Sequence, residues 1–217
     1  MIAVIVPIYN TEKYLRETID SVICQTLSFA EHIRLILLDD ASTDGSFAIC
    51  EQYQKQYPKQ IVVKHYDTNQ GVSALRNEGV RIAGEMGDEL ITFLDSDDKL
   101  ADDAVEKAKM YFESHEDISV AAIAVKYFGT RDGEQRLNWR FQEMDVVDIK
   151  KQYTFPHYYV GGVFLRKRVL NELHFDETMN FWEDALAINQ VIVSEGKYGL
   201  IQDTFYFYRK REDESSL

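Results

Sequence analysis

The chain has 217 residues and a formal net charge of −13, and 45% of its residues are hydrophobic and 12% aromatic. A chain of this length and apolar content can bury roughly 70–75% of its unfolded surface, which excludes an intrinsically disordered protein. The acidic balance excludes a broad nucleic-acid-binding surface, since such a surface needs clustered Lys and Arg. Any phosphate-bearing ligand must then be held by local cations, by a metal or by backbone amides.

The cysteines and histidines form no recognisable reactive or metal-binding motif. Cys24 and Cys50 are far apart, which is typical of a protein in a reducing cytoplasm. Four histidines, His65 among them, have no partner that the sequence identifies, and we expect them to be structural or on the surface. No apolar run reaches about 18 residues and no signal peptide begins the chain, so a membrane contact would need sequence outside it.

Strand and helix patterns alternate along the first half of the chain. Residues 2–8 are continuously apolar and β-branched, which is typical of a strand buried on both faces, and Pro7 is expected to end its pairing. A helix with an apolar stripe follows, with Thr11 as its predicted cap. The same strand and helix pattern recurs at residues 33–57, 61–84 and 88–114, and a further apolar segment covers residues 118–128.

This alternation predicts an α/β fold with a mostly parallel central sheet and helices on both faces. In such sheets ligands bind beyond the carboxyl ends of the strands. The polar segments at residues 7–10, 39–40, 69–77 and 95–98 follow predicted strands, so we expect them to converge at one edge. The pattern weakens after residue 127 and returns near residue 161.

Three carboxylates lie at or directly after the end of the predicted strand at residues 88–95. In an extended segment Asp95 and Asp97 would face one side while Ser96 and Asp98 face the other. Two hard oxygens on one side suit Mn²⁺ or Mg²⁺, with phosphate and water oxygens completing the shell. A solvated turn or a helix cap explains the same residues equally well.

Other polar residues have a structural and a functional interpretation. Asp39 and Asp40 end a predicted strand, and one of them is suited to accept a hydrogen bond from a ligand, although the turn that follows needs no ligand. Arg76 is either the cation that a diphosphate requires or a surface residue. Glu183 and Asp184 begin a predicted helix, where acidic side chains favour the helix dipole, so they need no catalytic role.

Six motifs in this order resemble the family 2 glycosyltransferases of the GT-A fold. They are VPIYN, LLDDASTDGS, NQGVSALRN, FLDSDD, GGVFLRK and WEDA, and the resemblance covers about residues 1–210. It implies a GT-A Rossmann-like three-layer α/β/α fold in a single domain of residues 1–217. Residues 1–126 would be the nucleotide-sugar-binding half, and residues 127–217 would hold the acceptor site, the catalytic base and a loose tail at 211–217. We expect a bacterial-type enzyme whose N-terminal catalytic domain this chain forms.

The resemblance also implies a role at each matching position. Each role belongs either to nucleotide binding, to metal binding or to catalysis. Pro7 and Tyr9 match residues lining the base, Asp40 (Asp39 as second choice) the uracil-binding aspartate, Asn69 and Arg76 further nucleotide contacts, Asp95 the ribose-side aspartate, Asp97 the ligand of Mn²⁺ or Mg²⁺, and Asp184 the general base, with Glu183 as its neighbour.

The implied reaction is a metal-dependent, inverting transfer of a hexosyl or N-acetylhexosaminyl group from a nucleotide sugar, preferably a UDP-sugar. The acceptor would be a hydroxyl of a glycan or cell-surface polymer in polysaccharide biosynthesis. A sugar nucleotidylyltransferase is one alternative, but it should carry a glycine-rich phosphate loop after the first strand, where VPIYNTEKY has no glycine. A non-catalytic nucleotide- or glycan-binding module is another, although it would have little use for the base Asp184.

Overall fold

The structure, a computed structural model, describes residues 1–130, 135–136, 144–151, 160–179 and 181–211. Its strands are β1 (Ile2–Ile8), β2 (Ile33–Asp39), β3 (Ile61–His65), β4 (Leu90–Phe93), β5 (Lys99–Leu100), β6 (Val120–Gly129), β7 (Gln135–Arg136), β8 (Val146–Asp148), β9 (Val163–Arg166) and β10 (Lys197–Lys210). Its helices are α1 (Glu12–Ile23), α2 (Phe29–His32), α3 (Ser46–Gln56), α4 (Val72–Glu85), α5 (Ala104–Ser114) and α6 (Glu183–Glu195), with a 3₁₀ turn η2 (Lys167–Val169).

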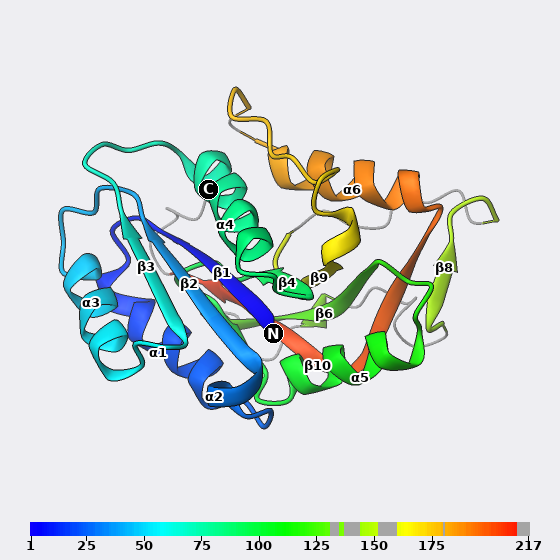
Figure 1. The fold of residues 1–217 in the computed structure, drawn as a ribbon, viewed down its shortest axis with the longest axis horizontal. Coiled ribbons are helices and arrows are strands. Elements are labelled where there is room, and N and C mark those ends of the chain that lie inside the picture. Colours follow the sequence, from blue (N-terminus) through cyan, green and yellow to red (C-terminus); the bar gives the residue numbers. More distant parts are fainter. Residues whose placement is uncertain (131–134, 137–143, 152–159, 180, 212–217) are drawn as a thin grey trace.

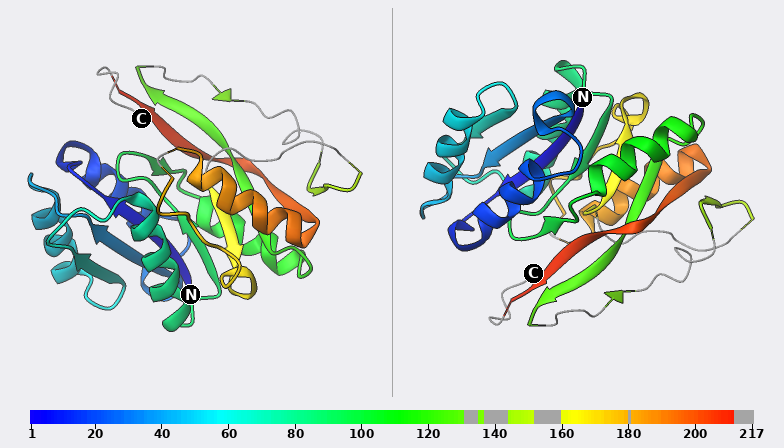
Figure 2. Two further views of the ribbon diagram at one scale, coloured as in Figure 1. Left: turned by 90° about the horizontal axis from the view of Figure 1, so that it is seen from above. Right: turned by 90° about the horizontal axis from the view of Figure 1, so that it is seen from below.

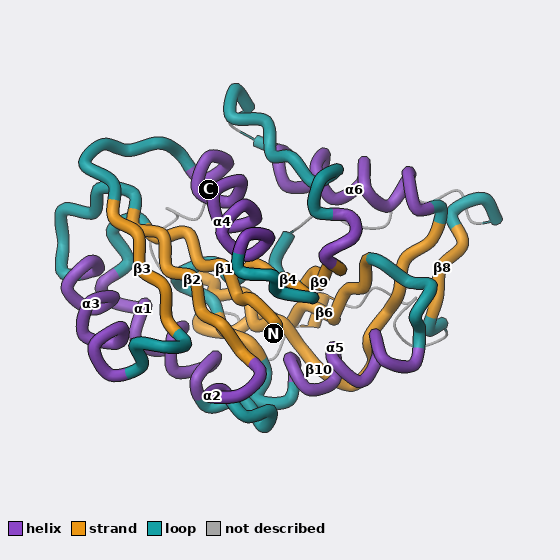
Figure 3. The backbone as a smooth tube through the Cα atoms, in the orientation of Figure 1, coloured by secondary structure: helices purple, strands orange, loops and turns teal. Residues whose placement is uncertain are grey.

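One sheet forms the centre of the molecule, with helices on both faces (Figures 1 and 3). Its strands lie in the order β3-β2-β1-β4-β9-β6-β10-β5, while β7 pairs with β6 and β8 pairs with β10. The predicted α/β class with three layers is confirmed. None of the helices in the described part of the chain has the length and apolar character of a membrane span.

The half of the sheet formed by β1 to β4 is parallel, as the sequence predicts. β1 lies at its centre, and each of its residues is buried. Pairing with β4 ends at Ile5, but pairing with β2 continues through Pro7 to Ile8, so the expectation that Pro7 ends the pairing is wrong on this side. A proline removes one N–H donor but keeps a backbone angle that a strand tolerates, so its neighbours can extend the ladder.

The other half of the sheet is mixed. β9 lies antiparallel between β4 and β6, and β10 runs parallel to β6 over most of its length. Figure 2 shows β10 alongside β6 across the molecule. α6 precedes β10 and returns the chain to the edge of the sheet at which β6 begins. β10 therefore brings residues 206–210, and Arg211 after them, back to the loop that follows β4.

Two apolar layers cover the two faces of the sheet. On β1, Val4 and Val6 face the layer formed with α1, α3 and α5, whereas Ala3 and Ile5 face the layer formed with α4 and α6. This alternation is the period-two pattern of a strand buried on both sides. At Gly79 of α4, a Cβ atom would lie 2.3 Å from Ile5 Cγ2, so glycine lets this helix pack closely on β1.

The start of α1 differs from the prediction in one detail. Thr11 occupies the N-cap position, but its side chain makes no capping hydrogen bond, and its buried Oγ1 has no partner among the described residues. Instead, the Thr11 amide donates to Ser46 Oγ over 2.9 Å and the Glu12 amide donates to Asp44 Oδ2 over 3.0 Å. The loop after β2 thus supplies the acceptors that the expected cap does not.

Candidate functional site

A pocket of about 510 Å³ lies at the carboxyl ends of β1, β2 and β4. Polar segments that are far apart in the sequence meet there, as expected for ligand sites in sheets of this kind. The residues of the predicted site that line it are Pro7, Tyr9, Asp40, Asn69, Asp95 and Asp97, and they are joined by Thr11, Gly71, Ser96, Asp98, Tyr208 and Arg211 among others.

The two aspartates that end β2 point in different directions. Asp40 lines the pocket, where its Oδ1 accepts a hydrogen bond from the Gln70 amide (2.6 Å) and its Oδ2 accepts one from the Gly71 amide (3.0 Å). Asp39 is fully buried, and its Oδ2 lies 2.7 Å from His65 Nδ1, away from the pocket lining. His65 thus has a partner that the sequence did not reveal. Asp40 therefore holds two backbone amides at the rim of the pocket, while Asp39 is buried against His65.

The segment Asp95–Asp98 forms a turn and is not extended, because the Asp98 amide donates to the Asp95 carbonyl over 3.0 Å. Alternation between two faces therefore does not describe it. Asp98 is only 2% exposed and accepts hydrogen bonds from Tyr206 Oη and from the Arg209 amide, both over 2.7 Å. Burial raises the pKa of Asp98 well above its ordinary value, and the charges of Asp95 and Asp97 raise it further.

Asp97 lies at the pocket with a cationic partner from the end of the described chain. Arg211 donates to Asp97 Oδ2 from Nε over 2.8 Å and from Nη2 over 2.6 Å. Burial raises the pKa of Asp97, the neighbouring charge of Asp95 adds to this, and Arg211 opposes it. Arg211 was expected to begin a loose tail, but it contacts the carboxylate cluster, while the remaining tail at 212–217 lies outside the described residues.

Two glycines explain how Tyr206 reaches this cluster. A Cβ atom at Gly161 would lie 2.6 Å from Tyr206 Cζ, and one at Gly162 would lie 2.9 Å from Tyr206 Cβ. Gly162 also has a φ of +75°, which side-chain-bearing residues rarely adopt. The tyrosine ring fits against this backbone, and its hydroxyl also accepts a hydrogen bond from the Asp95 amide over 3.2 Å. The glycine pair of GGVFLRK therefore leaves space for Tyr206, whose hydroxyl contacts the turn at Asp95–Asp98.

Arg76 links this turn to the beginning of α6. Its Nη1 lies 2.9 Å from Glu183 Oε1, and its Nη2 lies 3.4 Å from Asp95 Oδ1. The guanidinium also lies over the Phe175 ring, with 5.6 Å from Cζ to the ring centroid. Arg76 is 5% exposed and does not line the pocket, so it stands between two carboxylates instead of facing an open ligand space.

Asp184 lies in the first turn of α6, next to the residue that Arg76 holds. Its Oδ1 accepts a hydrogen bond from the Ala185 amide (2.6 Å) and its Oδ2 accepts one from the Val160 amide (3.3 Å). Trp182, the preceding N-cap residue, has a φ of +67°. Burial raises the pKa of Asp184, while the charge of Arg76 opposes this rise. A buried carboxylate with a raised pKa is a stronger base than an ordinary aspartate.

The pocket suits a divalent cation only in combination with a ligand. In the described part of the chain, no three or more His, Cys, Asp and Glu side chains gather as a metal site. Asp95 and Asp97 nevertheless both line the pocket, and burial together with the charge of Asp95 raises the pKa of Asp97. Mg²⁺ commonly binds through one or two carboxylates and the phosphates of its substrate. The donor set therefore fits a cation that arrives with a phosphorylated ligand.

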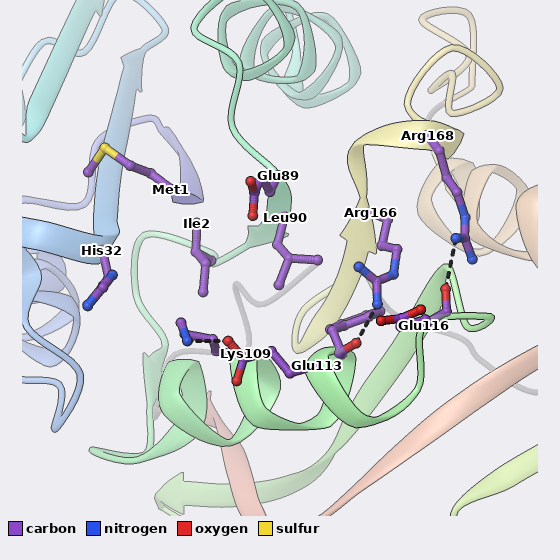
Figure 4. Close-up of a pocket in the computed structure, with 11 residues that line it drawn as sticks. Met1, Ile2, His32, Glu89, Leu90, Lys109, Glu113, Glu116, Arg166 and Arg168 are labelled. Carbon is purple, nitrogen blue, oxygen red and sulfur yellow. Dashed lines mark hydrogen bonds and ion pairs between the residues drawn. The ribbon is translucent and has the colours of Figure 1, made fainter.

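A second pocket, of about 550 Å³, lies at the opposite edge of the sheet (Figure 4). It is lined by the start of β1 and β4 and by Arg166 and Arg168 near the end of β9. Both arginines are already satisfied by the protein: Arg166 Nε donates to the Ile118 carbonyl over 2.8 Å, and Arg168 Nη1 donates to the Glu116 carbonyl over 2.9 Å. The two arginines join the end of β9 and η2 to the segment between α5 and β6, which is a structural role.

Comparison with known proteins agrees with this geometry. The model of glycosyl transferase family 2 matches residues 3–174. The chain is 41% identical over 219 residues to "Minor teichoic acid biosynthesis protein GgaA" of Bacillus subtilis (strain 168), covering 100% of this chain and 49% of GgaA. It is 27% identical to "Poly(ribitol-phosphate) beta-N-acetylglucosaminyltransferase TarS" of Staphylococcus aureus (strain Mu50), covering 98% of this chain and 36% of TarS. The chain thus spans about half, or less, of the length of these relatives.

A solved structure supports the same assignment. The crystal structure of S. aureus TarS 1-349 in complex with UDP-GlcNAc superposes with a TM-score of 0.79 at 25% identity, over 100% of this chain and 61% of that one. The predicted GT-A fold is confirmed by this similarity. Together with the family match over most of the chain, it establishes that the chain is a glycosyltransferase domain and belongs to glycosyl transferase family 2.

Proposed function

We propose that this domain transfers a sugar from a UDP-sugar to a hydroxyl group of a teichoic-acid-type polymer, with inversion at the anomeric carbon. The observation that carries the proposal is the convergence of Asp40, Asn69, Asp95 and Asp97 on one pocket, joined through Arg76 to the helix of Asp184. The names of the relatives support the polymer acceptor, and the UDP-GlcNAc complex of TarS supports a UDP-linked donor.

The nucleotide is expected to occupy the side of the pocket near Tyr9 and Asp40. Tyr9 is 52% exposed and directly follows β1, which contains Pro7. The tyrosine ring therefore offers an apolar face to a base. Asp40 already accepts two backbone hydrogen bonds, and each carboxylate oxygen has a further lone pair for a ligand N–H. Asn69, on the exposed rim, is positioned to contact the ribose or the phosphates.

Asp184 is the proposed general base. Its carboxylate takes the proton from the acceptor hydroxyl while the hydroxyl oxygen forms a bond to the anomeric carbon. The bond from this carbon to the diphosphate oxygen breaks, and the nucleoside diphosphate leaves with its electron pair. The raised pKa of Asp184 favours this role, because a general base works best when its pKa approaches the working pH.

Asp97, with Asp95 beside it, is the proposed holder of Mn²⁺ or Mg²⁺ in the donor complex. A divalent cation would supply stabilisation of the negative charge that develops on the diphosphate. The two carboxylates repel each other in the pocket, so a cation that binds with the donor would relieve this repulsion.

We place the reaction in the cytoplasm, since the free cysteines Cys24 and Cys50 fit a reducing compartment.

A thermal-shift screen tests the donor assignment. UDP, GDP, CDP and dTDP are each added with Mn²⁺, with Mg²⁺ and with EDTA, and the unfolding midpoint is recorded. A ligand at 100 times its dissociation constant adds about 2.7 kcal/mol of stability, which shifts the midpoint of a domain this size by roughly 5–10 °C. We expect the largest shift with UDP and metal. If no nucleotide shifts the midpoint, the pocket is not a donor site and the non-catalytic alternative replaces this proposal.

A further inference from the structure

The donor pocket is strongly acidic, although its proposed ligand is an anion. Four carboxylates line it, those of Asp40, Asp95, Asp97 and Asp98, and a nucleoside diphosphate adds further negative charges. Among the described residues that line the pocket, Arg211 is the only Lys or Arg. The protein's own contribution to holding the diphosphate must therefore come largely from this side chain or from backbone amides.

The sequence motif pointed to another cation, Arg76, but its position leaves it little freedom. Both ends of its guanidinium contact carboxylates, Glu183 at 2.9 Å and Asp95 at 3.4 Å, and its side chain is 6% exposed. A diphosphate would have to displace Glu183, whose side chain is 13% exposed, to reach Nη1, which is unfavourable because the released carboxylate would stay buried. Arg76 serves to join two parts of the site, and another residue is needed for the anion.

Arg211 has both the exposure and the unused donors that an anion requires. Its side chain is 20% exposed, and its Nε and Nη2 both donate to a single oxygen, Oδ2 of Asp97. A guanidinium has five N–H donors in a planar fork, so the Nη1 group and the second hydrogen of Nη2 remain for another acceptor. An arginine can in this way hold Asp97 and a phosphate oxygen together.

The position of Arg211 is fixed by the strand that directly precedes it. The neighbouring Arg209 donates from its amide to Asp98 Oδ1 over 2.7 Å and from its Nε to the Asp97 carbonyl over 2.6 Å. The guanidinium of Arg211 lies over the Tyr14 ring, with Cζ 5.0 Å from the centroid. The end of β10 is thereby attached to the turn at Asp95–Asp98, and Arg211 reaches the pocket from a supported backbone.

We infer that Arg211 is the arginine that binds the diphosphate of the donor, bridging it to Asp97 at the pocket. This inference rests on the proposed donor pocket and adds to it a residue from the opposite end of the chain. It assigns charge recognition to Arg211, while the base-binding side of the pocket near Tyr9 and Asp40 is separate. Loss of Arg211 should therefore weaken binding of the diphosphate but not of the nucleoside.

The test compares UDP with uridine, which lacks the phosphates. Dissociation constants of UDP are measured by titration calorimetry, and those of uridine by ligand-observed NMR, each in EDTA and with Mn²⁺. The proteins are the wild type, Arg211→Gln, Arg211→Lys and the matched control Lys210→Gln. Lys210 is the adjacent residue and does not itself line the pocket, and its Nζ lies 4.6 Å from the ring centroid of Tyr208, so its variant removes the same charge and leaves every lining side chain in place.

We expect Arg211→Gln to weaken UDP binding at least tenfold in EDTA while uridine binding stays within twofold of the wild type. Arg211→Lys should retain part of the UDP affinity, since it keeps the charge but loses the planar fork, and Lys210→Gln should match the wild type. The inference is overturned if Arg211→Gln binds UDP as tightly as the wild type, or if it loses UDP and uridine affinity equally. A wild-type protein that binds no UDP in either condition would instead overturn the donor pocket itself, and the inference with it.

Discussion

Arg76 and Glu183, 107 positions apart in the chain, form an ion pair in which Nη1 lies 2.9 Å from Oε1. The arginine comes from α4, beside the donor pocket, and the glutamate begins α6, directly before the proposed base. Because the same guanidinium also contacts Asp95, it joins the turn after β4 to the start of α6. A single buried side chain therefore links the pocket to the helix of the proposed base.

The first prediction concerns the stability of this link. Removing one partner of a buried pair leaves an uncompensated charge, so Arg76→Gln and Glu183→Gln should each lower the free energy of unfolding by about 3 kcal/mol. The double variant should lose clearly less stability than the sum of the losses in the two single variants. Urea unfolding of the four proteins measures the coupling. The exposed pair Arg81 and Glu85 of α4 is the control, and its coupling should stay below about 0.5 kcal/mol; equal couplings for both pairs would contradict the prediction.

The second prediction concerns the pH dependence of transfer. Burial raises the pKa of Asp184, and only its deprotonated form can accept the proton of the acceptor. Activity should therefore be present above this raised pKa and be lost as the pH falls through it. We expect the acidic inflection of kcat/KM to lie clearly above about 3.9, the ordinary value for aspartate. The profile is measured over the pH range in which circular dichroism shows a folded protein; a flat profile down to pH 4 would argue against a buried base.

The third prediction concerns Asp97 and the metal. Asp97→Asn removes one anionic oxygen ligand, so the affinity for UDP should no longer increase when Mn²⁺ is added. Calorimetric titration with Mn²⁺ and with EDTA measures this difference. Asp102→Asn removes the same charge at an exposed position outside the pocket lining and should retain the metal effect. If Asp97→Asn keeps the full effect of Mn²⁺, the metal ligand lies elsewhere.

The fourth prediction concerns the two thiols. Burial, with the charge of Asp39 adding to it, raises the pKa of Cys50 to about 12, whereas Cys24 is exposed. Because the thiolate is the reactive form, Cys24 should react with a disulfide reagent at pH 8 more than about a thousandfold faster than Cys50. Spectrophotometric titration should count one thiol in the native protein and two in denaturant. Cys24→Ser should abolish the rapid phase, and a rapid phase that persists would show that Cys50 is accessible.

The main features of the fold could be predicted from the sequence, because local patterns determine them. The apolar runs at β1 and β2 are long enough to identify strands buried on both faces, and the polar residues that follow them had to meet at one edge. Details that depend on contacts with neighbouring segments were harder to predict from the sequence. Pro7 continues the pairing with β2, and Thr11 makes no side-chain cap on α1, while Ser46 and Asp44 accept the amides of Thr11 and Glu12.

The site could be predicted only in part, since its charges are balanced by distant residues. Asp40, Asp95 and Asp97 were recognised from motifs that end strands, and all three line the pocket. The partners of the Asp97 and Asp98 carboxylates come from β10 and the residue after it, more than 100 positions later, where no local pattern marks a charged residue as part of a site. Arg211 was assigned to a loose tail for this reason. Knowing that β10 runs parallel to β6 was necessary to bring it to the pocket.

The central claim is that Asp184 is the base of a sugar transfer reaction, and single-turnover kinetics with the Asp184→Asn variant test it most directly. The wild type and the variant are mixed with UDP-GlcNAc and a teichoic-acid-type polymer, and both released UDP and glycosylated polymer are quantified by mass spectrometry. We expect equal amounts of the two products from the wild type. The variant should bind UDP as tightly but transfer about 10²–10⁴ times more slowly, because general-base catalysis typically contributes this factor. A variant that transfers at the wild-type rate would contradict the assignment of Asp184.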